Sequence, residues 1–112
     1  MAQRFVELNA GDVWWAAPSP SIGREQAGRR PVVVISGEDY HLTVTTLALV
    51  VPVTSTKRGW ANHLPVSVSD VSGWAMTEQV RAISRQRLER FVGALPPGQL
   101  EEIRGWVLDY LR

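Results

Sequence analysis

The pattern of hydrophobic and polar positions predicts a series of short β-strands followed by one helix. Over the first ninety residues, short apolar or alternating segments rich in β-branched and aromatic residues are separated by glycine, proline and polar turn residues. The expected strands cover residues 11–17, 31–36, 43–54, 63–69, 74–76 and 79–84. Since no helical segments lie between these strands, we predict a mainly antiparallel sheet that is curled on itself.

The C-terminal segment has a helical period instead. Pro97 suits the first turn of a helix, and the apolar positions that follow are spaced for one helix face. They are Leu100, Ile103, Val107, Leu108 and Leu111. We therefore expect an amphipathic helix that packs on the sheet. Residues 84–88 are expected to form a single helical turn capped by Ser84.

The connections between the strands differ in length. Gly37–Asp39 and Ser72–Gly73 are interpreted as tight turns. Residues 18–29 form a twelve-residue loop, which is longer than most connections in a compact domain. Long loops that are held at both ends by strands commonly carry function, so this loop is the first place to look for a site.

Composition narrows the classes of function. The 112 residues are 45% hydrophobic and 21% charged, which is typical of one globular domain spanning residues 1–112. Cysteine is absent, so disulfides, thiolate metal sites and cysteine nucleophiles are excluded. His41 and His63 lack the spacing of metal ligands, and we expect neither a metal nor another cofactor.

No apolar run approaches the roughly 20 residues of a membrane span, and the first residues do not resemble a signal peptide, so we expect a cytoplasmic protein without membrane contact.

Charge is concentrated locally. Eleven of the twelve basic residues are arginine, and the formal net charge is only +1. Residues 24–30 and residues 78–90 each carry a net charge of +2, so any positive field is confined to these segments. The arginines of the second segment are expected to form a solvated or partner-facing surface; they are Arg81, Arg85, Arg87 and Arg90.

A candidate site for phosphate chemistry lies where two of the strands end. Arg30 directly precedes a buried strand, and Thr54 ends the longest strand. If these strands are neighbours, the two side chains lie close together, with Glu25 placed to orient a guanidinium. Such a set can bind a phosphodiester and stabilise a pentavalent phosphorus.

Four segments in order closely resemble the MazF/PemK family, the toxins of bacterial toxin–antitoxin pairs. The resemblance runs from about Gly11 to Leu111. The matching segments are GDVWW from Gly11, GREQAGRRP with VVVIS at residues 23–36, VVPVTS at residues 50–55, and EQVRAIS with QRL at residues 78–88.

This resemblance implies an α+β fold, mainly β, in the form of a small SH3-like antiparallel barrel that is shared with CcdB toxins and carries a C-terminal helix. It further implies a homodimer that cleaves single-stranded RNA at short sequences without a metal. Its catalytic residues fall on Arg30, Thr54 and Glu25, with Arg29 placed to bind a flanking phosphate. The family's cut uses the RNA 2′-hydroxyl and leaves a 2′,3′-cyclic phosphate and a 5′-hydroxyl. Because arginine stays charged, it is a poor base, and the general base is unassigned.

RNA recognition is expected in the loop after Thr54. The candidate RNA-binding residues there are Ser55, Lys57, Arg58, Trp60 and His63. Trp60 either stacks on a base or covers the open end of the barrel, and His63 is either a substrate contact or a surface histidine.

The family partner is an antitoxin whose acidic, disordered C-terminal segment folds over the RNA groove. Two other functions are open at this point, namely a CcdB-like gyrase poison and a barrel that binds RNA or an acidic peptide without cutting.

Overall fold

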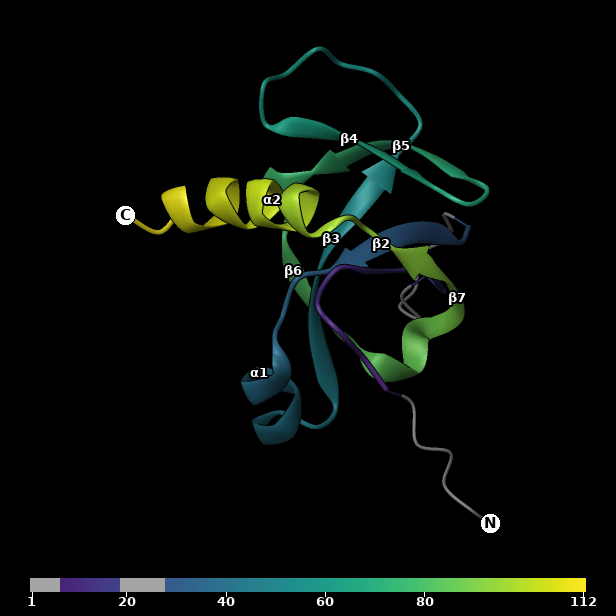
Figure 1. Ribbon diagram of the computed structural model, residues 1–112. Helices are drawn as coiled ribbons and strands as arrows, with labels where there is room; N and C mark the ends of the chain where they lie inside the picture. Colours follow the sequence, from purple (N-terminus) through teal and green to yellow (C-terminus); the bar gives the residue numbers. More distant parts are fainter. Residues whose placement is uncertain (1–6, 19–27) are drawn as a thin grey trace.

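The computed structural model describes residues 7–18 and 28–112, and its main feature is a curled antiparallel sheet (Figure 1). The described strands are β1 (Asp12–Ala16), β2 (Arg30–Val34), β3 (Leu47–Thr54), β4 (His63–Val68), β5 (Val71–Met76), β6 (Arg81–Ser84) and β7 (Leu88–Ala94). The helices are α1 (Glu38–Thr43) and α2 (Pro97–Asp109), with single 3-10 turns η1 (Thr77–Gln79) and η2 (Arg85–Arg87). The predicted class, mainly β with a C-terminal helix, is confirmed.

Strand β3 gives the sheet its curl. The strands follow the order β4-β5-β3-β2-β1-β7, and β6 pairs with β3 outside this path. The first half of β3 pairs with β6, from Leu47 to Val50, whereas Val53 and Thr54 at its end pair with β5. Because one long strand serves two partners on the same edge, the sheet bends along β3 into a half-barrel.

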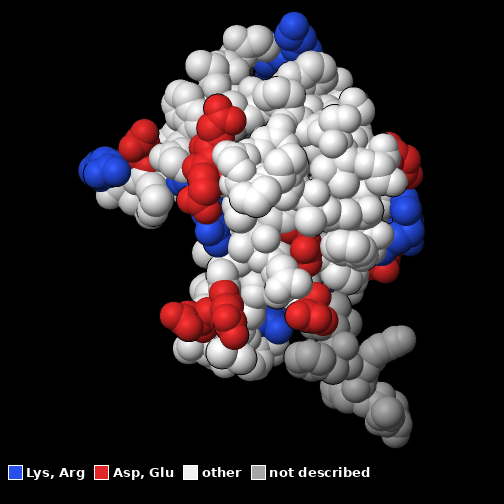
Figure 2. Space-filling model, in the orientation of Figure 1, with Lys and Arg blue, Asp and Glu red and all other residues white. Residues whose placement is uncertain are grey.

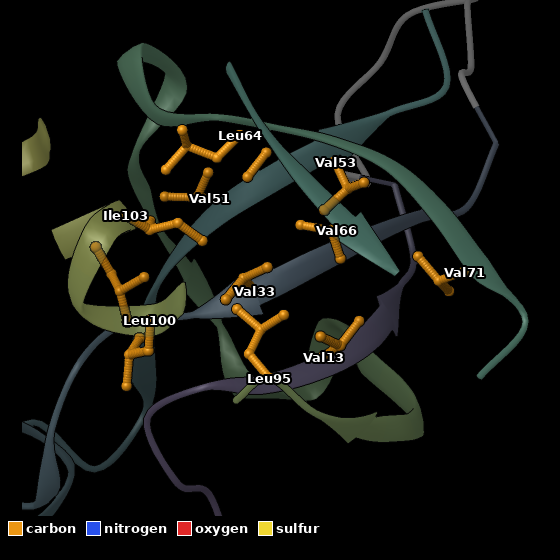
Figure 3. Close-up of a cluster of buried hydrophobic side chains, with 12 residues drawn as sticks. Val13, Val33, Val51, Val53, Leu64, Val66, Val71, Leu95, Leu100 and Ile103 are labelled. Carbon is orange, nitrogen blue, oxygen red and sulfur yellow. The ribbon is translucent and has the colours of Figure 1, made fainter. Parts of the chain in front are cut away.

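Alternate residues of the central strands pack into two separate cores. Val13, Val33 and Val51 point to one side and join the cluster that Figure 3 shows between the sheet and α2. Trp14, Val32, Val34, Val50 and Ile83 belong to a second cluster on the opposite side. Both faces of β1–β3 are therefore buried, which explains the nearly continuous apolar sequence of these strands.

Helix α2 covers the first core. Leu100 and Ile103 insert between the strands (Figure 3), and Arg104 donates from Nε and Nη2 to the Ile35 carbonyl at 3.1 and 2.9 Å. The predicted helix is confirmed, although the far end of its apolar stripe, at Leu108 and Leu111, is exposed. No helix in the described part of the chain has the length and apolar character needed to cross a membrane.

The segment after β2 differs from the prediction. We expected a tight turn at residues 37–39 and a strand from Thr43, but residues 38–43 form α1 and β3 starts only at Leu47. Long-range contacts explain the difference. Arg85 donates to the carbonyls of His41, Val44 and Leu47, and these bonds fix the backbone there against the local β propensity of its threonines.

The turn expected at Ser72–Gly73 is also wrong. The two-residue turn of the β4–β5 hairpin is Ser69–Asp70, where Ser69 has a φ of 52°. Gly73 lies inside β5, and a Cβ there would come within 2.3 Å of the Thr54 carbonyl oxygen. The glycine serves close packing of two strands, which sequence alone does not distinguish from a turn.

Strand β7 was not predicted. Its residues are mostly exposed, and its pairing with β1 is interrupted by two register shifts, so it lacks the alternation by which strands are found. The helical turn at residues 85–87 was predicted correctly. The Ser84 hydroxyl oxygen accepts a bond from the Gln86 N–H at 3.2 Å, as a capping residue does.

Candidate functional site

A groove of about 460 Å³ lies on the side of the sheet that carries the second core. Its floor is formed by strand residues Val32, Val50, Pro52 and Ile83, which contribute no hydrogen-bonding side chain. The remaining lining residues are Ala16, Ala17, Pro18, Gly28, Arg30, Met76, Gln79, Arg81 and Arg87. Among the described residues the lining thus holds three guanidinium groups and no carboxylate, a composition suited to a polyanion.

Arg30 lines this groove, and Thr54 ends the neighbouring strand β3. Strands β2 and β3 pair in antiparallel register, with Val32 opposite Pro52. Continuing that register by two residues on each strand places Arg30 opposite Thr54, and residues opposite each other share a face. The neighbouring strands required for the candidate site are therefore present.

The same alternation separates Arg30 from Arg29. Arg30 lines the groove, whereas the Arg29 Nε donates to the Glu89 carboxylate of β7 at 2.5 Å. Both partners of this ion pair are exposed, with side-chain exposures of 62% and 37%. The geometry favours Arg30 as the residue that meets a bound phosphodiester.

Thr54 is held by a local bond at the end of β3. Its Oγ1 accepts a hydrogen bond from the Thr56 N–H at 3.1 Å, which fixes the hydroxyl oxygen and leaves the hydroxyl proton free to be donated. Glu25, the third predicted catalytic residue, lies outside the described residues.

The arginines of residues 78–90, which we expected on a solvated or partner-facing surface, have two kinds of surroundings. Arg81 is opposite Val50 in the β3–β6 pairing, so it faces the groove, and Arg87 reaches the groove from η2. Arg85 is engaged with backbone carbonyls near α1, and Arg90 pairs with Asp70 at 3.3 Å. Two of the four arginines therefore line the groove and two do not.

The loop between β3 and β4 carries exposed candidates for RNA contact. Ser55, Lys57 and Arg58 are exposed, and Trp60 is 50% exposed. The Arg58 guanidinium carbon lies 5.7 Å from the centre of the Trp60 ring, and the centroids of the Trp60 and His63 rings are 4.8 Å apart. Trp60 is thus braced in place with half of its surface accessible.

His63 itself is buried, so neither a surface position nor a direct RNA contact fits it. Its side chain is 1% exposed, and its Nε2 lies 2.9 and 3.0 Å from the two carboxylate oxygens of Glu78. Burial raises the pKa of Glu78, but the hydrogen bond from His63, together with further hydrogen bonds from the Glu78 backbone and from Gln79, outweighs it, and the pKa lies below its usual range. His63 therefore supports the loop beneath Trp60.

A further hydrogen-bond network ties the same loop to the end of α2. The Asn62 Nδ2 donates to Glu78 at 3.0 Å and to the Tyr110 hydroxyl at 2.9 Å. The fully buried Thr77 donates to the Asn62 carbonyl and also contacts the Tyr110 hydroxyl. Sequence reasoning missed this network, because its members lie in three separate segments and form no local motif.

Basic charge is dispersed on the face of the molecule that Figure 2 shows. On the face shown in Figure 2 the basic side chains are separated from one another, and much of the surface is uncharged. The three arginines of the groove form a local concentration of positive charge. The net charge of +2 on residues 24–30 and on residues 78–90 had predicted such a local field. Within residues 7–18 and 28–112, no group of three or more histidine or acidic side chains is arranged to hold a metal ion.

Gly73 packs closely against the backbone of Thr54, a candidate site residue, and substitution of Gly73 tests the importance of this contact. Gly73→Ala brings a Cβ to 2.3 Å from the Thr54 carbonyl oxygen, so we expect the end of β3 to shift and the free energy of unfolding to fall by about 1–3 kcal/mol. The matched control is Gly105→Ala in α2, where a Cβ meets nothing within 4 Å and stability should rise by about 1 kcal/mol. Urea unfolding measures both, and equal stabilities for the two variants would contradict the packing argument.

Fold and groove together define a class: a small, curled β-domain with an arginine-lined groove at the ends of its central strands. Residues 9–111 match the model of the family described as PemK-like, MazF-like toxin of type II toxin-antitoxin system. The chain is 34% identical to the endoribonuclease toxin MazF of Escherichia coli K12 over 105 residues, which cover 93% of each chain. This chain belongs to the PemK-like, MazF-like toxin family.

Solved structures agree with this assignment. MazF from Deinococcus radiodurans superposes with a TM-score of 0.77 at 32% identity, over 93% of this chain and 96% of that one. A MazE–MazF structure from the same organism matches with a TM-score of 0.75 at 34% identity, over 93% and 95% of the two chains. The fold predicted from the family resemblance is confirmed, and the predicted enzyme class, endoribonuclease, is the one that the E. coli relative carries in its name.

Proposed function

We propose that this chain is the toxin of a toxin–antitoxin pair and a sequence-specific endoribonuclease that cuts single-stranded RNA without a metal. The observation that supports the proposal is the pairing of β2 with β3, because its register, continued to the strand ends, sets Thr54 opposite Arg30, and Arg30 lines the groove with two other arginines. The groove suits the phosphates of a polyanion, and the E. coli relative is named an endoribonuclease. Cutting of RNA in the cytoplasm would inhibit translation and growth.

RNA supplies its own nucleophile for this reaction. The 2′-hydroxyl oxygen attacks the adjacent phosphorus, the bond from phosphorus to the 5′-oxygen breaks, and the products carry a 2′,3′-cyclic phosphate and a 5′-hydroxyl. The 2′-hydroxyl loses its proton and the departing 5′-oxygen gains one, so the protein needs to supply alignment and stabilisation of charge.

Arg30 is assigned to the non-bridging oxygens of the scissile phosphate. These oxygens gain negative charge when phosphorus becomes pentavalent, and a guanidinium held at the end of a strand donates two parallel hydrogen bonds to them. The apolar floor beneath Arg30 strengthens that interaction, because Val32 and Pro52 exclude water from one side of it. The arginine thus acts most strongly in the transition state.

Thr54 is assigned to a hydrogen bond from its hydroxyl to the same phosphate. Thr54→Ala removes this bond to a charged group, so we expect kcat to fall about 10- to 100-fold. Thr54→Ser keeps the hydroxyl and should retain most of the activity. Single-turnover cleavage of a labelled RNA compares the two variants, and equal activities would remove Thr54 from the mechanism.

Sequence recognition is assigned to the loop after Thr54. The exposed half of Trp60 offers a surface on which a base can stack, and Ser55, Lys57 and Arg58 are placed to contact the strand beside it. His63 supports this surface from below.

We further propose a homodimer and a cognate antitoxin as the protein partners. A MazE–MazF complex is among the similar solved structures. An acidic, disordered antitoxin segment complements a groove that holds three arginines and no carboxylate in its described lining, and it would inhibit cutting by covering Arg30.

A further inference from the structure

Arg81 and Arg87 line the groove together with Arg30, and contacts within the described part of the chain do not use all of their hydrogen-bond donors. Arg81 makes no hydrogen bond or ion pair with the residues that the structure describes, although it lies in a regular strand opposite Val50. Arg87 uses only its Nε within that part of the chain, donating to the Ala17 carbonyl at 2.9 Å. That bond fixes the guanidinium plane, and the two terminal amino groups remain to bind something else.

The other arginines of the same segment show what a structural arginine looks like here. Arg85 donates three hydrogen bonds to backbone carbonyls, and Arg90 is paired with the carboxylate of Asp70. Arg81 and the terminal amino groups of Arg87 differ from them, because they line the groove and have no partner among the described residues.

Arg81 and Arg87 are also close enough to repel each other. Partial burial lowers the pKa of Arg87 below its usual value, and the positive charge of Arg81 lowers it further. Two like charges facing one groove, with no carboxylate among its described lining residues, destabilise the empty protein. A bound anion removes that cost, which is the usual situation of a perturbed group at a functional site.

The arrangement gives the groove a second positive position. Arg30 is on β2, whereas Arg81 is on β6, on the far side of β3, and Arg87 comes from η2. Val50, which is opposite Arg81, pairs with Val34 of β2, four residues along that strand from Arg30, so Arg81 and Arg30 lie at different positions along the groove. A strand that runs across the floor therefore meets one positive group at Arg30 and a second at the pair.

We propose that Arg81 and Arg87 form a second phosphate-binding site, which holds the RNA phosphate next to the scissile one. The proposal rests on the proposed function for the identity of the strand. Its role is binding and alignment: the pair fixes where the RNA backbone lies, so that the phosphate at Arg30 is the one that is cut. Substitution here raises KM more than it lowers kcat.

The test measures binding separately from cutting. The probe is a short fluorescent single-stranded deoxyribo-oligonucleotide containing all four bases, which carries phosphates but no 2′-hydroxyl. Fluorescence anisotropy over a series of salt concentrations gives the slope of log K against log salt, which falls by about 0.7 for each single-strand phosphate contact that is lost. The proteins are the wild type, Arg81→Gln, Arg87→Gln, and Arg112→Gln as a matched control, because Arg112 pairs with Asp109 away from the groove.

We expect each groove variant to bind about tenfold more weakly with a reduced slope, and Arg112→Gln to match the wild type. Arg87→Lys separates charge from structure, because it keeps the charge while changing the contact with Ala17. Its slope should stay near that of the wild type. Wild-type slopes in both glutamine variants would overturn the proposal. Binding of a polyglutamate peptide is measured in the same way. If the glutamine variants lose affinity for this peptide and not for the oligonucleotide, the proposal is also overturned, and the pair is assigned to an acidic protein segment.

The same proteins distinguish this proposal from the proposed function. If the wild type cuts RNA and both glutamine variants bind and cut like it, the second site fails and the endoribonuclease stands. If the wild type cuts no RNA while the slopes fall as expected, the phosphate site stands and the endoribonuclease fails.

Discussion

Arg30→Ala is expected to lower kcat for RNA cleavage by about 10²-fold or more, since it removes a donor that acts on charge developing in the transition state. Arg30 is exposed at the start of β2, so its truncation opens no cavity in either core, and the variant should fold with unchanged stability. Cleavage rates under single-turnover conditions, together with the unfolding midpoint, separate loss of chemistry from loss of fold.

Arg29→Ala is the matched control for this experiment. Arg29 is the adjacent arginine, but it faces away from the groove and forms an exposed ion pair with Glu89, worth about 1 kcal/mol or less. Its loss should change kcat only slightly. Full activity of folded Arg30→Ala, or a larger loss in Arg29→Ala, would reverse the assignment of the two arginines.

The second large effect is expected in the substrate. Replacing the single ribose on the 5′ side of the cut with deoxyribose removes the attacking 2′-hydroxyl and should abolish cleavage at that bond. Binding should change little, because the phosphates that the arginines hold are all present. Mass spectrometry of the products, after incubation of matched oligonucleotides, gives the answer at single-bond resolution.

A deoxyribose one position further along the strand is the control substrate, and it should be cut at the original bond. Cleavage of the first substrate would exclude attack by the 2′-hydroxyl and would require water as the nucleophile.

Much of the fold follows from the sequence where local pattern and tertiary environment agree. The apolar runs at β2 and β3 are buried on both faces, and the stripe of α2 packs as its spacing predicts. Prediction failed where distant contacts decided the conformation. Arg85 fixes the end of α1 from the distant turn η2, and a side chain at position 73 would collide with the backbone of Thr54.

The candidate site was predictable to a similar extent. The juxtaposition of Arg30 and Thr54 followed from two strand ends and a single assumption of adjacency, which the register confirms. The positions of Arg81 and Arg87 in the groove, and of His63 beneath Trp60, depend on how β6, η2 and the β3–β4 loop fold back. These contacts cannot be predicted from the spacing of residues in the sequence, because they depend on segments that are far apart along the chain.

The most direct test of the central claim is to incubate the purified protein with a pooled single-stranded RNA library in EDTA and to map the new 5′-ends. We expect cleavage at one short motif, leaving 5′-hydroxyl ends, and the same library should stay intact with Arg30→Ala. An intact library with the folded wild-type protein, or cleavage that appears only after a divalent metal is restored, would contradict the account.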